Sequence, residues 1–561
     1  MKKKLKCHDL SIFVKSYDQG NNLFICFSVQ IRGCKFSTKV PSWATIDPES
    51  LSESKPYKME NLIGGKWVSS SKTQQIVDPY NGGNFYQVPL IDNQQAQQVI
   101  ELAKKVPKSG LHNPLRNPER YQMWGDINFK IAEGMRKPEI QHFFTRLTQR
   151  CMPKSYLQAQ GEVVVTRKFF ENFTGDNCRF LARGFIQPGD HTGQESIGYR
   201  WPYGPVALIT PFNFPIEIPC LQLFGATLAG NRPMFKPDNK MALVMEQFFR
   251  FAIDCGMSPE ELDFITSDNQ TINNIVASDV FRVIQFTGSS KVAEHLSQIT
   301  RGKVKIEDAG FDWKLYGPDV VDLDYAAWQA DQDAYACSGQ KCSAQSISFV
   351  HKNWVEAGLL QKVKDLAEQR TVDKLTIGPV ITWTNEQLQE HCNKVLKIPG
   401  SKVLFGGKPL TQKHNIPSVY GSFEPTAIYV PLKEISNHYD LVTTEIFAPF
   451  QIITEYESEA ELEQILDHLE RMKHHLTCAV VSNDVRFQNK VLGSTVNGTT
   501  YAGSRARTTG APQNHWFGPA GEPRGAGIGT PEAIKLVWTC HREIVKDIGP
   551  IPNGWTRPEQ S

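Results

Sequence analysis

The chain has 561 residues, of which 40% are hydrophobic and 21% charged, and its formal net charge is +2. This length exceeds what a single core supports, so we expect at least two domains. The near-neutral charge argues against a nucleic-acid or anionic-membrane partner, and no apolar run approaches the ~18–20 residues of a spanning helix. We therefore expect a soluble, globular protein.

The first 40 residues are more basic than the rest, with eight Lys or Arg against two acids, Asp9 and Asp18. A basic, acid-poor leader resembles an organellar transit peptide. We expect residues 1–45 to be a leader that directs the chain to the mitochondrial matrix. A disordered extension or an unusual start site is the alternative.

The twelve cysteines contain no C-x-x-C pair. This pattern predicts free thiols in a reducing compartment and no metal site.

The predicted elements begin near residue 60, with a hairpin at 64–68 and amphipathic helices at 94–106 and 117–134. From 203 to 310, strands and helices alternate. The strands are expected at 206–210, 233–236, 280–286 and 303–307, with helices at 216–229, 241–255 and 290–299 between them. This order implies a parallel sheet with right-handed crossovers. Such sheets bind ligands beyond the C-terminal ends of their strands, where Pro211, Lys236, Thr287 and Glu307 lie.

Two glycine-containing segments are candidates for phosphate binding. The turn at 286–290 enters a helix whose free N–H groups suit a phosphate, although Ser-Ser is also a good N-cap. The run at 524–529 resembles G-x-G-x-x-G but has different spacing and no preceding strand. We interpret it as a tight loop before a helix at 531–542.

Cys342 follows a glycine turn in Gly-Gln-Lys-Cys-Ser-Ala, and Glu307 lies 35 residues upstream. A thiol nucleophile and a carboxylate base are the two groups needed to form and then hydrolyse a thioester. An isolated cysteine, by contrast, is more often a small buried hydrophobe.

Six motifs resemble, in order and spacing, those of the aldehyde dehydrogenase superfamily, over roughly residues 60–550. They are 211–215 (Pro-Phe-Asn-Phe-Pro), 236–237 (Lys-Pro), 286–289 (Phe-Thr-Gly-Ser), Glu307 with Gly310, Cys342, and 445–449 (Glu-Ile-Phe-Ala-Pro). The resemblance implies an α/β fold with two parallel-sheet domains and a small β-flap for oligomerisation. The expected assembly is a homo-oligomer, either a symmetric dimer or larger.

The implied domains follow the motifs along the chain. Residues 58–177 and 202–307 would form an NAD-binding domain, and 308–530 a catalytic domain. The flap and C-terminal tail would comprise 178–201 and 531–561.

The resemblance also implies roles for individual residues. Cys342 would attack the aldehyde carbon, Asn213 and the Cys342 backbone N–H would hold the oxyanion, and Glu307 would activate water. Lys236 would bind the adenine-side ribose, Ser289 the pyrophosphate and Glu445 the nicotinamide ribose. The full set expected at the NAD site is Thr210, Pro211, Phe212, Lys236, Gly288, Ser289, Gly310, Glu445 and Phe447.

Two positions depart from the family pattern. The usual Glu-Leu-Gly-Gly turn reads Glu-Asp-Ala-Gly, which places Asp308 and Ala309 after the expected base. Many NAD-preferring members carry an acid three residues after the lysine, where this chain has Asn239. An acid there would repel a 2′-phosphate, so strict NAD preference is less firmly indicated, and NAD remains the expected cofactor.

The Gly-Gln-Lys-Cys-Ser-Ala and Pro-Phe-Asn-Phe forms resemble the pyrroline-5-carboxylate (glutamate semialdehyde) dehydrogenase branch. The leader and residues 61–67 resemble its plant-type members. Ser343 would bind the substrate carboxylate, and Phe517 would flank its methylenes. The loop at 517–529 departs from the branch pattern, and Gly525, Ala526 and Gly527 are the candidate backbone N–H donors.

The expected reaction is NAD-dependent oxidation of L-glutamate 5-semialdehyde, in equilibrium with 1-pyrroline-5-carboxylate, to L-glutamate in proline catabolism. Two alternatives remain open. One is a dehydrogenase for another small anionic aldehyde, such as succinate semialdehyde. The other is a non-catalytic structural descendant of the family.

Overall fold

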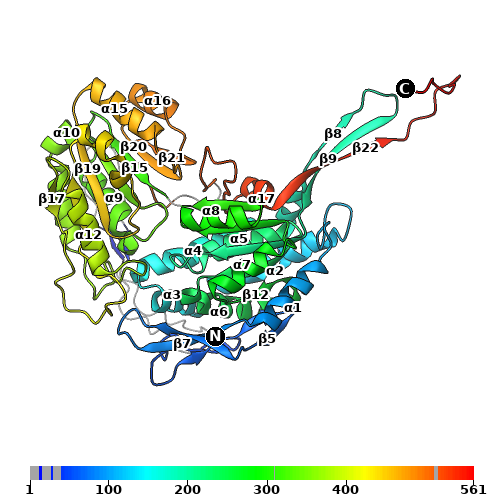
Figure 1. Ribbon diagram of the computed structural model, residues 1–561, viewed down its shortest axis with the longest axis horizontal. Coiled ribbons are helices and arrows are strands. Elements are labelled where there is room, and N and C mark those ends of the chain that lie inside the picture. The colour runs from blue at the N-terminus through cyan, green and yellow to red at the C-terminus, as the bar shows by residue number, and fades with distance from the viewer. Residues whose placement is uncertain (1–11, 15–26, 30–39, 309, 511–515) are drawn as a thin grey trace, which may run out of the picture.

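Two lobes, each built on a seven-stranded sheet, face each other across the molecule (Figure 1). The computed structural model describes residues 12–14, 27–29, 40–308, 310–510 and 516–561. A three-stranded sheet projects from one lobe as a long arm (Figure 1). Among the described residues, we find no helix both long and apolar enough to cross a membrane.

The sheet of the first lobe has the predicted parallel core. Its strand order is β14 (Val304–Asp308), β13 (Val283–Gly288), β10 (Pro205–Thr210), β11 (Arg232–Pro237), β12 (Asp263–Phe264), β4 (Asn61–Ile63) and β5 (Lys66–Val68). The first five strands are parallel, and β4 and β5 add an antiparallel hairpin at the edge. The prediction missed β12, a strand of two residues that is too short to show a period.

Helices cover both faces of this sheet. Those that connect its parallel strands are α5 (Glu217–Leu228), α6 (Ala242–Asp254), α7 (Asn269–Ala277) and α8 (Ser290–Ile299). Four more come from the N-terminal part: α1 (Asn93–Lys104), α2 (Glu119–Arg136), α3 (Pro138–Cys151) and α4 (Tyr156–Asn172). A small sheet of β3 (Tyr57–Lys58), β7 (Asn84–Leu90) and β6 (Lys72–Val77) lies beside them.

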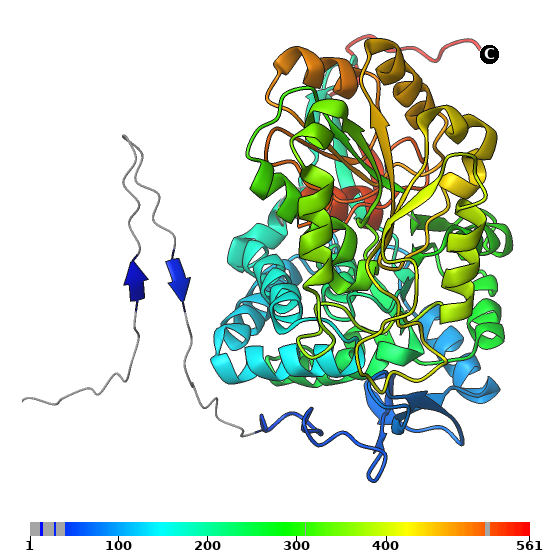
Figure 2. The ribbon, with the colours of Figure 1, turned by 90° about the vertical axis from the view of Figure 1, so that its left-hand side faces the viewer.

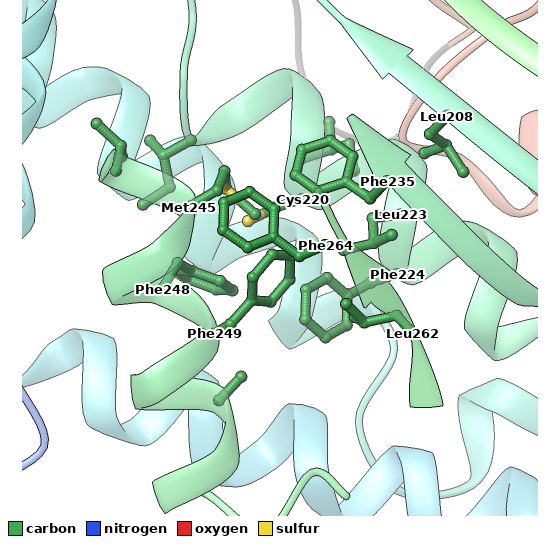
Figure 3. Close-up of a cluster of buried hydrophobic side chains, with 14 of the residues drawn as sticks. Leu208, Cys220, Leu223, Phe224, Phe235, Met245, Phe248, Phe249, Leu262 and Phe264 are labelled. Atoms are coloured by element: carbon green, nitrogen blue, oxygen red, sulfur yellow. The ribbon is translucent and has the colours of Figure 1, made fainter. Parts of the chain in front are cut away.

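Aromatic side chains fill the core between the sheet and helices α5 and α6 (Figure 3). Phe224 of α5 meets Phe248 of α6 at 5.9 Å between ring centroids, and Phe235 of β11 stacks on Phe264 of β12 at the same distance. Such pairs contribute about 0.5–1.5 kcal/mol beyond simple area burial. This packing holds α5 firmly, and the loop before α5 carries Asn213.

The sheet of the second lobe is also mostly parallel. Its order is β17 (Lys402–Phe405), β18 (Thr426–Tyr429), β19 (Phe450–Tyr456), β16 (Gln345–His351), β15 (Asp312–Tyr316), β20 (Thr477–Val481) and β21 (Thr499–Ala502). Only β17 runs antiparallel to its neighbour. Helix α9 (Leu323–Tyr335) lies against this sheet and leads into the turn that carries Cys342.

The projecting arm joins segments far apart in the sequence. It consists of β8 (Phe185–Pro188), β9 (Gln194–Pro202) and β22 (Thr539–Asp547), all antiparallel. The helix expected at 531–542 ends at Trp538, because the following residues pair along the whole length of β9. Helix α17 (Pro531–Trp538) therefore connects the first lobe to the arm.

Two expected boundaries differ from the structure. The end of the segment expected to form the catalytic domain returns to the first lobe: Ile306 of β14 donates its N–H to the Arg524 carbonyl and accepts from the Ala526 N–H, both at 2.8 Å. The end of the expected leader is also part of the folded body, since Trp43 stacks on Phe144 at 5.5 Å between ring centroids.

The rest of the expected leader lies largely outside the described residues. Within it, β1 (Ile12–Val14) and β2 (Phe27–Val29) pair with each other in antiparallel fashion. The two strands stand apart from the globular body (Figure 2).

Candidate active site

Cys342 lies at the junction of two cavities between the lobes. One, of about 250 Å³, is lined by residues of α4 and α5 together with Cys342, Ser343 and Phe517; we call it the α4 cavity. The other, of about 300 Å³, is lined by Asn213, Gly288, Ser289, Glu307, Cys342 and Glu445, among others; we call it the α8 cavity. A group held in either cavity would therefore meet the same sulfur.

A strained turn presents Cys342. Cys337, Ser338 and Gly339 all have left-handed backbone conformations, with φ of 57°, 55° and 68°. Such a conformation costs a non-glycine residue about 1–3 kcal/mol, so surrounding contacts must enforce it. The Ser338 hydroxyl accepts from the Gly378 N–H at 2.8 Å, and the Gln340 side chain accepts from the Ile381 N–H at 2.7 Å.

Two glycines allow the chain to approach Cys342 closely. A Cβ at Gly310 would lie 2.0 Å from the Cys342 carbonyl oxygen, and one at Gly339 would lie 2.0 Å from the Ala448 carbonyl oxygen. No side chain fits at either distance. Gly310 thus places the segment after Glu307 against the turn that carries Cys342, and Gly339 places that turn against the segment after Glu445.

Buried acids surround the thiol. Burial and the negative charges of Glu307 and Asp312 raise the pKa of Cys342 well above its ordinary value. Burial also raises the pKa of Glu307 to about 8, although its interaction with Cys342 opposes the shift. Glu307 is only 2% exposed. Near neutral pH the raised pKa values favour a neutral pair, in which Cys342 is a thiol and Glu307 is a protonated carboxyl. Loss of one proton gives either a thiolate, which can act as a nucleophile, or a carboxylate, which can act as a base.

Asn213 is held by a buried ion pair. Lys154, just before α4, contacts Glu162 at 2.8 Å, and both side chains are fully buried. The same ammonium donates to the Asn213 carbonyl at 2.8 Å, while Glu162 accepts from the Ile216 N–H at 2.9 Å. The Asn213 side chain lies in the wall of the α8 cavity, and its Oδ1 has no hydrogen-bond partner among the described residues. This leaves the amide available to a bound molecule.

Most residues expected to bind the cofactor come together in the α8 cavity. Those in its wall are Pro211, Phe212, Gly288, Ser289, Glu445 and Phe447. Ser289 is the N-cap of α8, but its hydroxyl makes no capping hydrogen bond. Glu445 accepts from the Gly310 N–H at 3.3 Å.

Three other residues expected at the NAD site, Thr210, Lys236 and Gly310, are not part of this cavity wall. Thr210 and Lys236 lie near the C-terminal ends of the adjacent strands β10 and β11. Burial lowers the pKa of Lys236, whose ammonium makes no hydrogen bond or ion pair with a described residue. Lys236 is therefore open to an external partner.

The expected substrate residues divide into two groups. Ser343 and Phe517 line the α4 cavity. Gly525 and Ala526 do not serve as free donors, because their N–H groups already donate to the carbonyls of Glu522 and Ile306, each at 2.8 Å. Pairing of this loop with β14 explains the difference and leaves Gly527 as the remaining candidate of the three.

Two of the residues that depart from the family pattern contact other residues of the chain. Asp308 Oδ2 lies 3.9 Å from His474 Nδ1. Ala309 is outside the described residues. The Asn239 amide donates to Gln74 at 2.8 Å and to the Ser267 carbonyl at 3.0 Å.

Several cavity residues could not be found by motif. Thr382 and Trp383 line the α8 cavity, and Gln158 and Glu217 line the α4 cavity. Lys154 and Glu162 form an ion pair although they are eight residues apart, and no motif or periodic pattern in the sequence indicates it. Glu217 alone had a local signal, since it lies three residues after the Pro-Phe-Asn-Phe motif.

Comparison with known proteins identifies the family. The model of the aldehyde dehydrogenase family matches residues 67–522. The chain is 57% identical over 519 residues to Delta-1-pyrroline-5-carboxylate dehydrogenase 12A1, mitochondrial, of Arabidopsis thaliana, covering 92% of this chain and 93% of that protein. It is also 57% identical over 526 residues to a probable aldehyde dehydrogenase of Linum usitatissimum, covering 93% and 95%.

Solved structures show the same fold at low identity. Betaine aldehyde dehydrogenase of Staphylococcus aureus, solved as a point mutant in complex with NAD+, superposes with a TM-score of 0.76 at 19% identity, covering 89% of this chain and 99% of the other. A 3,6-anhydro-L-galactose dehydrogenase gives 0.74 at 19% identity, covering 87% and 100%.

Glu307→Gln should change how stability depends on pH. The pKa of Glu307 rises from 4.5 to about 8 on folding, so between these values the folded state keeps a proton that the unfolded state loses. The stability contributed by Glu307 is thus complete below pH 4.5 and is lost as the pH rises to 8. The Gln variant should gain relative to wild type by up to about 1.4 kcal/mol for each pH unit in this window.

Urea unfolding of both proteins at pH 5, 7 and 9 measures this difference. Glu119→Gln is the control, because Glu119 is exposed in the first turn of α2. Parallel stability curves for wild type and Glu307→Gln would contradict the assignment of a raised pKa to Glu307.

Proposed function

Because the chain belongs to the aldehyde dehydrogenase family, we propose that it oxidises L-glutamate 5-semialdehyde to L-glutamate with NAD, as a step of proline catabolism. The semialdehyde is in equilibrium with 1-pyrroline-5-carboxylate. The observation that carries the proposal is the position of Cys342 in the walls of both cavities, beside Glu307 and Asn213. The substrate is supported by the name of the Arabidopsis relative.

Glu307 and Cys342 perform the chemistry in two stages. Glu307 accepts the thiol proton, and the Cys342 thiolate attacks the aldehyde carbon to form a thiohemiacetal. Asn213 and the Cys342 backbone N–H stabilise the oxyanion, a contribution worth about 2.7–4 kcal/mol per donor. After oxidation to the thioester, Glu307 releases the thiol proton to solvent and then takes a proton from water, whose oxygen attacks the acyl carbon. The Cys342 thiolate leaves and takes the proton back from Glu307, and the carboxylic acid product loses its proton to solvent.

The α8 cavity suits NAD because its wall combines the free Ser289 hydroxyl at the N-terminus of α8 with the Glu445 carboxyl. Ser289 would bind the pyrophosphate, Glu445 the nicotinamide ribose, and Lys236 the adenine-side ribose. When bound, NAD supplies the acceptor for the hydride lost in oxidation. Phe447 and Trp383 contribute apolar surface that excludes water from the cavity.

The α4 cavity would then hold the rest of the aldehyde. Its wall offers the Ser343 hydroxyl for the substrate carboxylate and Phe517 for the methylenes. A cavity of about 250 Å³ accommodates a small aliphatic aldehyde.

Cys342→Ala should abolish the reaction. Loss of a catalytic nucleophile typically lowers kcat by about 10⁴-fold or more. The measurement is NADH formation at 340 nm with glutamate semialdehyde and with succinate semialdehyde, in wild type and variant. Glu307→Gln should lower the rates of both thioester formation and hydrolysis, because Gln can accept neither the thiol proton nor the proton of water.

The arms of this assay separate the parts of the proposal. Equal wild-type rates with the two semialdehydes would overturn the substrate assignment. An unchanged rate in Cys342→Ala would overturn the mechanism. Absence of activity with every aldehyde would favour a structural descendant of the family.

We also propose that the arm of β8, β9 and β22 forms the interface of a homo-oligomer built from symmetric dimers. Each outer strand has one edge that pairs with no other described strand, and Ile186 of β8 and Val545 of β22 are 69% and 56% exposed. Ile186→Asp should shift the assembly toward monomer in light scattering. Val485→Asp, equally exposed at 63% but in the other lobe, should leave the mass unchanged. A monomeric wild type would contradict the proposal.

We propose further that the chain acts in the mitochondrial matrix. The proposal is supported by the basic first 40 residues and by the word mitochondrial in the name of the Arabidopsis relative. Import into isolated mitochondria should protect the chain from added protease, and deletion of residues 1–39 should prevent this. Protection of the deleted chain would contradict the role of the leader.

A further inference from the structure

The α4 cavity contains an acidic group that the reaction does not use. Its described wall includes two carboxyls, Glu162 and Glu217, and no lysine or arginine. This is unexpected for a cavity that must hold an anionic substrate. A carboxylate-binding cavity would ordinarily present cations.

The two carboxyls differ in their partners. Glu162 is fully buried and engaged, since it contacts Lys154 at 2.8 Å and accepts from the Ile216 N–H at 2.9 Å. The Glu217 backbone N–H also donates to Glu162, at 3.3 Å. The Glu217 carboxyl itself has no hydrogen bond or ion pair with any described residue. Glu217 is therefore the carboxyl in this cavity wall that has no partner among the described residues.

The fold places Glu217 close to the reacting centre. It stands in the first turn of α5, four residues after Asn213. Its neighbour Ile218 lines both the α4 cavity and the α8 cavity, as Cys342 does. The Lys154–Glu162 pair holds this turn in place. Glu217 is thus fixed in the cavity wall beside the junction where the aldehyde carbon must sit.

The surroundings of Glu217 favour a cationic partner. Burial and the charges of Glu162 and Glu307 raise the pKa of Glu217 to about 8, and Lys154 only partly offsets them. The protein surroundings thus disfavour the carboxylate form. A cation brought into the cavity would stabilise that form and gain a charge-assisted hydrogen bond.

We propose that Glu217 binds the α-ammonium group of the substrate and so selects amino aldehydes against semialdehydes that carry only a carboxylate. This inference rests on the proposed oxidation of glutamate semialdehyde. The substrate is then held at two places, with Ser343 for its carboxylate and Glu217 for its ammonium. An anion such as succinate semialdehyde would face the same carboxyl without a compensating charge.

A competing role for Glu217 is proton transfer between Glu307 and solvent. The charge of Glu307 contributes to the raised pKa of Glu217, so the two carboxyls interact electrostatically. A proton carrier acts on every aldehyde alike, because the proton released does not depend on the substrate chain. Substrate dependence therefore separates the two roles.

The test compares two aldehydes that differ only at the α-carbon. Glutamate 5-semialdehyde carries an ammonium group there, and glutarate semialdehyde carries hydrogen. Glu217→Gln should lower kcat/KM for glutamate semialdehyde by about ten- to hundredfold, the loss expected for a charged hydrogen bond. It should leave kcat/KM for glutarate semialdehyde unchanged or raised. Each variant is compared with wild type on the same substrate, so cyclisation of the amino aldehyde cancels.

Binding provides a readout independent of turnover. Calorimetry with the products should show that Glu217→Gln weakens binding of L-glutamate but not of glutarate. Glu119→Gln is the matched control, since Glu119 also lies in the first turn of a helix but is exposed and outside the cavity wall. Glu217→Asp keeps the charge and should retain part of the preference for the amino aldehyde. It also tests the proposal if the Gln variant does not fold.

The kinetic and calorimetric results separate the ammonium site, the proton-transfer role and the proposed function. An equal fall for both aldehydes would assign Glu217 to proton transfer and overturn the proposal, as would no change for either. A wild type inactive on glutamate semialdehyde but active on another aldehyde would refute the proposed function instead. A selective loss for the amino aldehyde, together with weaker L-glutamate binding, would establish the ammonium site.

Discussion

The buried ion pair between Lys154 and Glu162 is the interaction on which the site depends. It connects the start of α4 to the loop before α5, and both partners are removed from water. Loss of one partner of such a pair typically costs about 3–5 kcal/mol, because the other charge stays buried alone. The pair directly holds the Asn213 carbonyl and the amides of the first turn of α5. It therefore positions Asn213, the proposed oxyanion donor, together with Glu217.

Close approach of the two lobes is the second constraint. Glu307 and Asn213 come from the first lobe, whereas Cys342 and Glu445 come from the second lobe. Gly310 lets the backbone after Glu307 lie against the Cys342 carbonyl, where any side chain would collide. The left-handed turn before Cys342 also brings the two lobes close together. Hydrogen bonds to the segment around Gly378 offset the free energy that this strained backbone costs.

The electrostatics of the site follow from this crowding. Several acids share one water-poor region, so burial raises the pKa values of Glu307, Glu217 and Cys342 together. The resting site is thus close to neutral, and negative charge develops only where a bound molecule or a donor can meet it. In the α4 cavity we propose that this molecule is an ammonium-bearing aldehyde, and in the α8 cavity the proposed donor is the Asn213 amide.

The sequence alone predicted the candidate nucleophile, base and oxyanion donor, because each stands in a local motif. It also predicted the parallel core of the first sheet, because its strands and helices show short periods. Only the tertiary structure decided the composition of the cavity walls, since these join segments up to several hundred residues apart. It ended the last helix at Trp538 through pairing with β9, and it engaged the Gly525 and Ala526 amides within the chain. It also placed the Glu217 carboxyl in the same cavity wall as Cys342, without a hydrogen bond or ion pair to a described residue. Sequence cannot show this, because hydrogen bonding and burial depend on residues that are neighbours only in space.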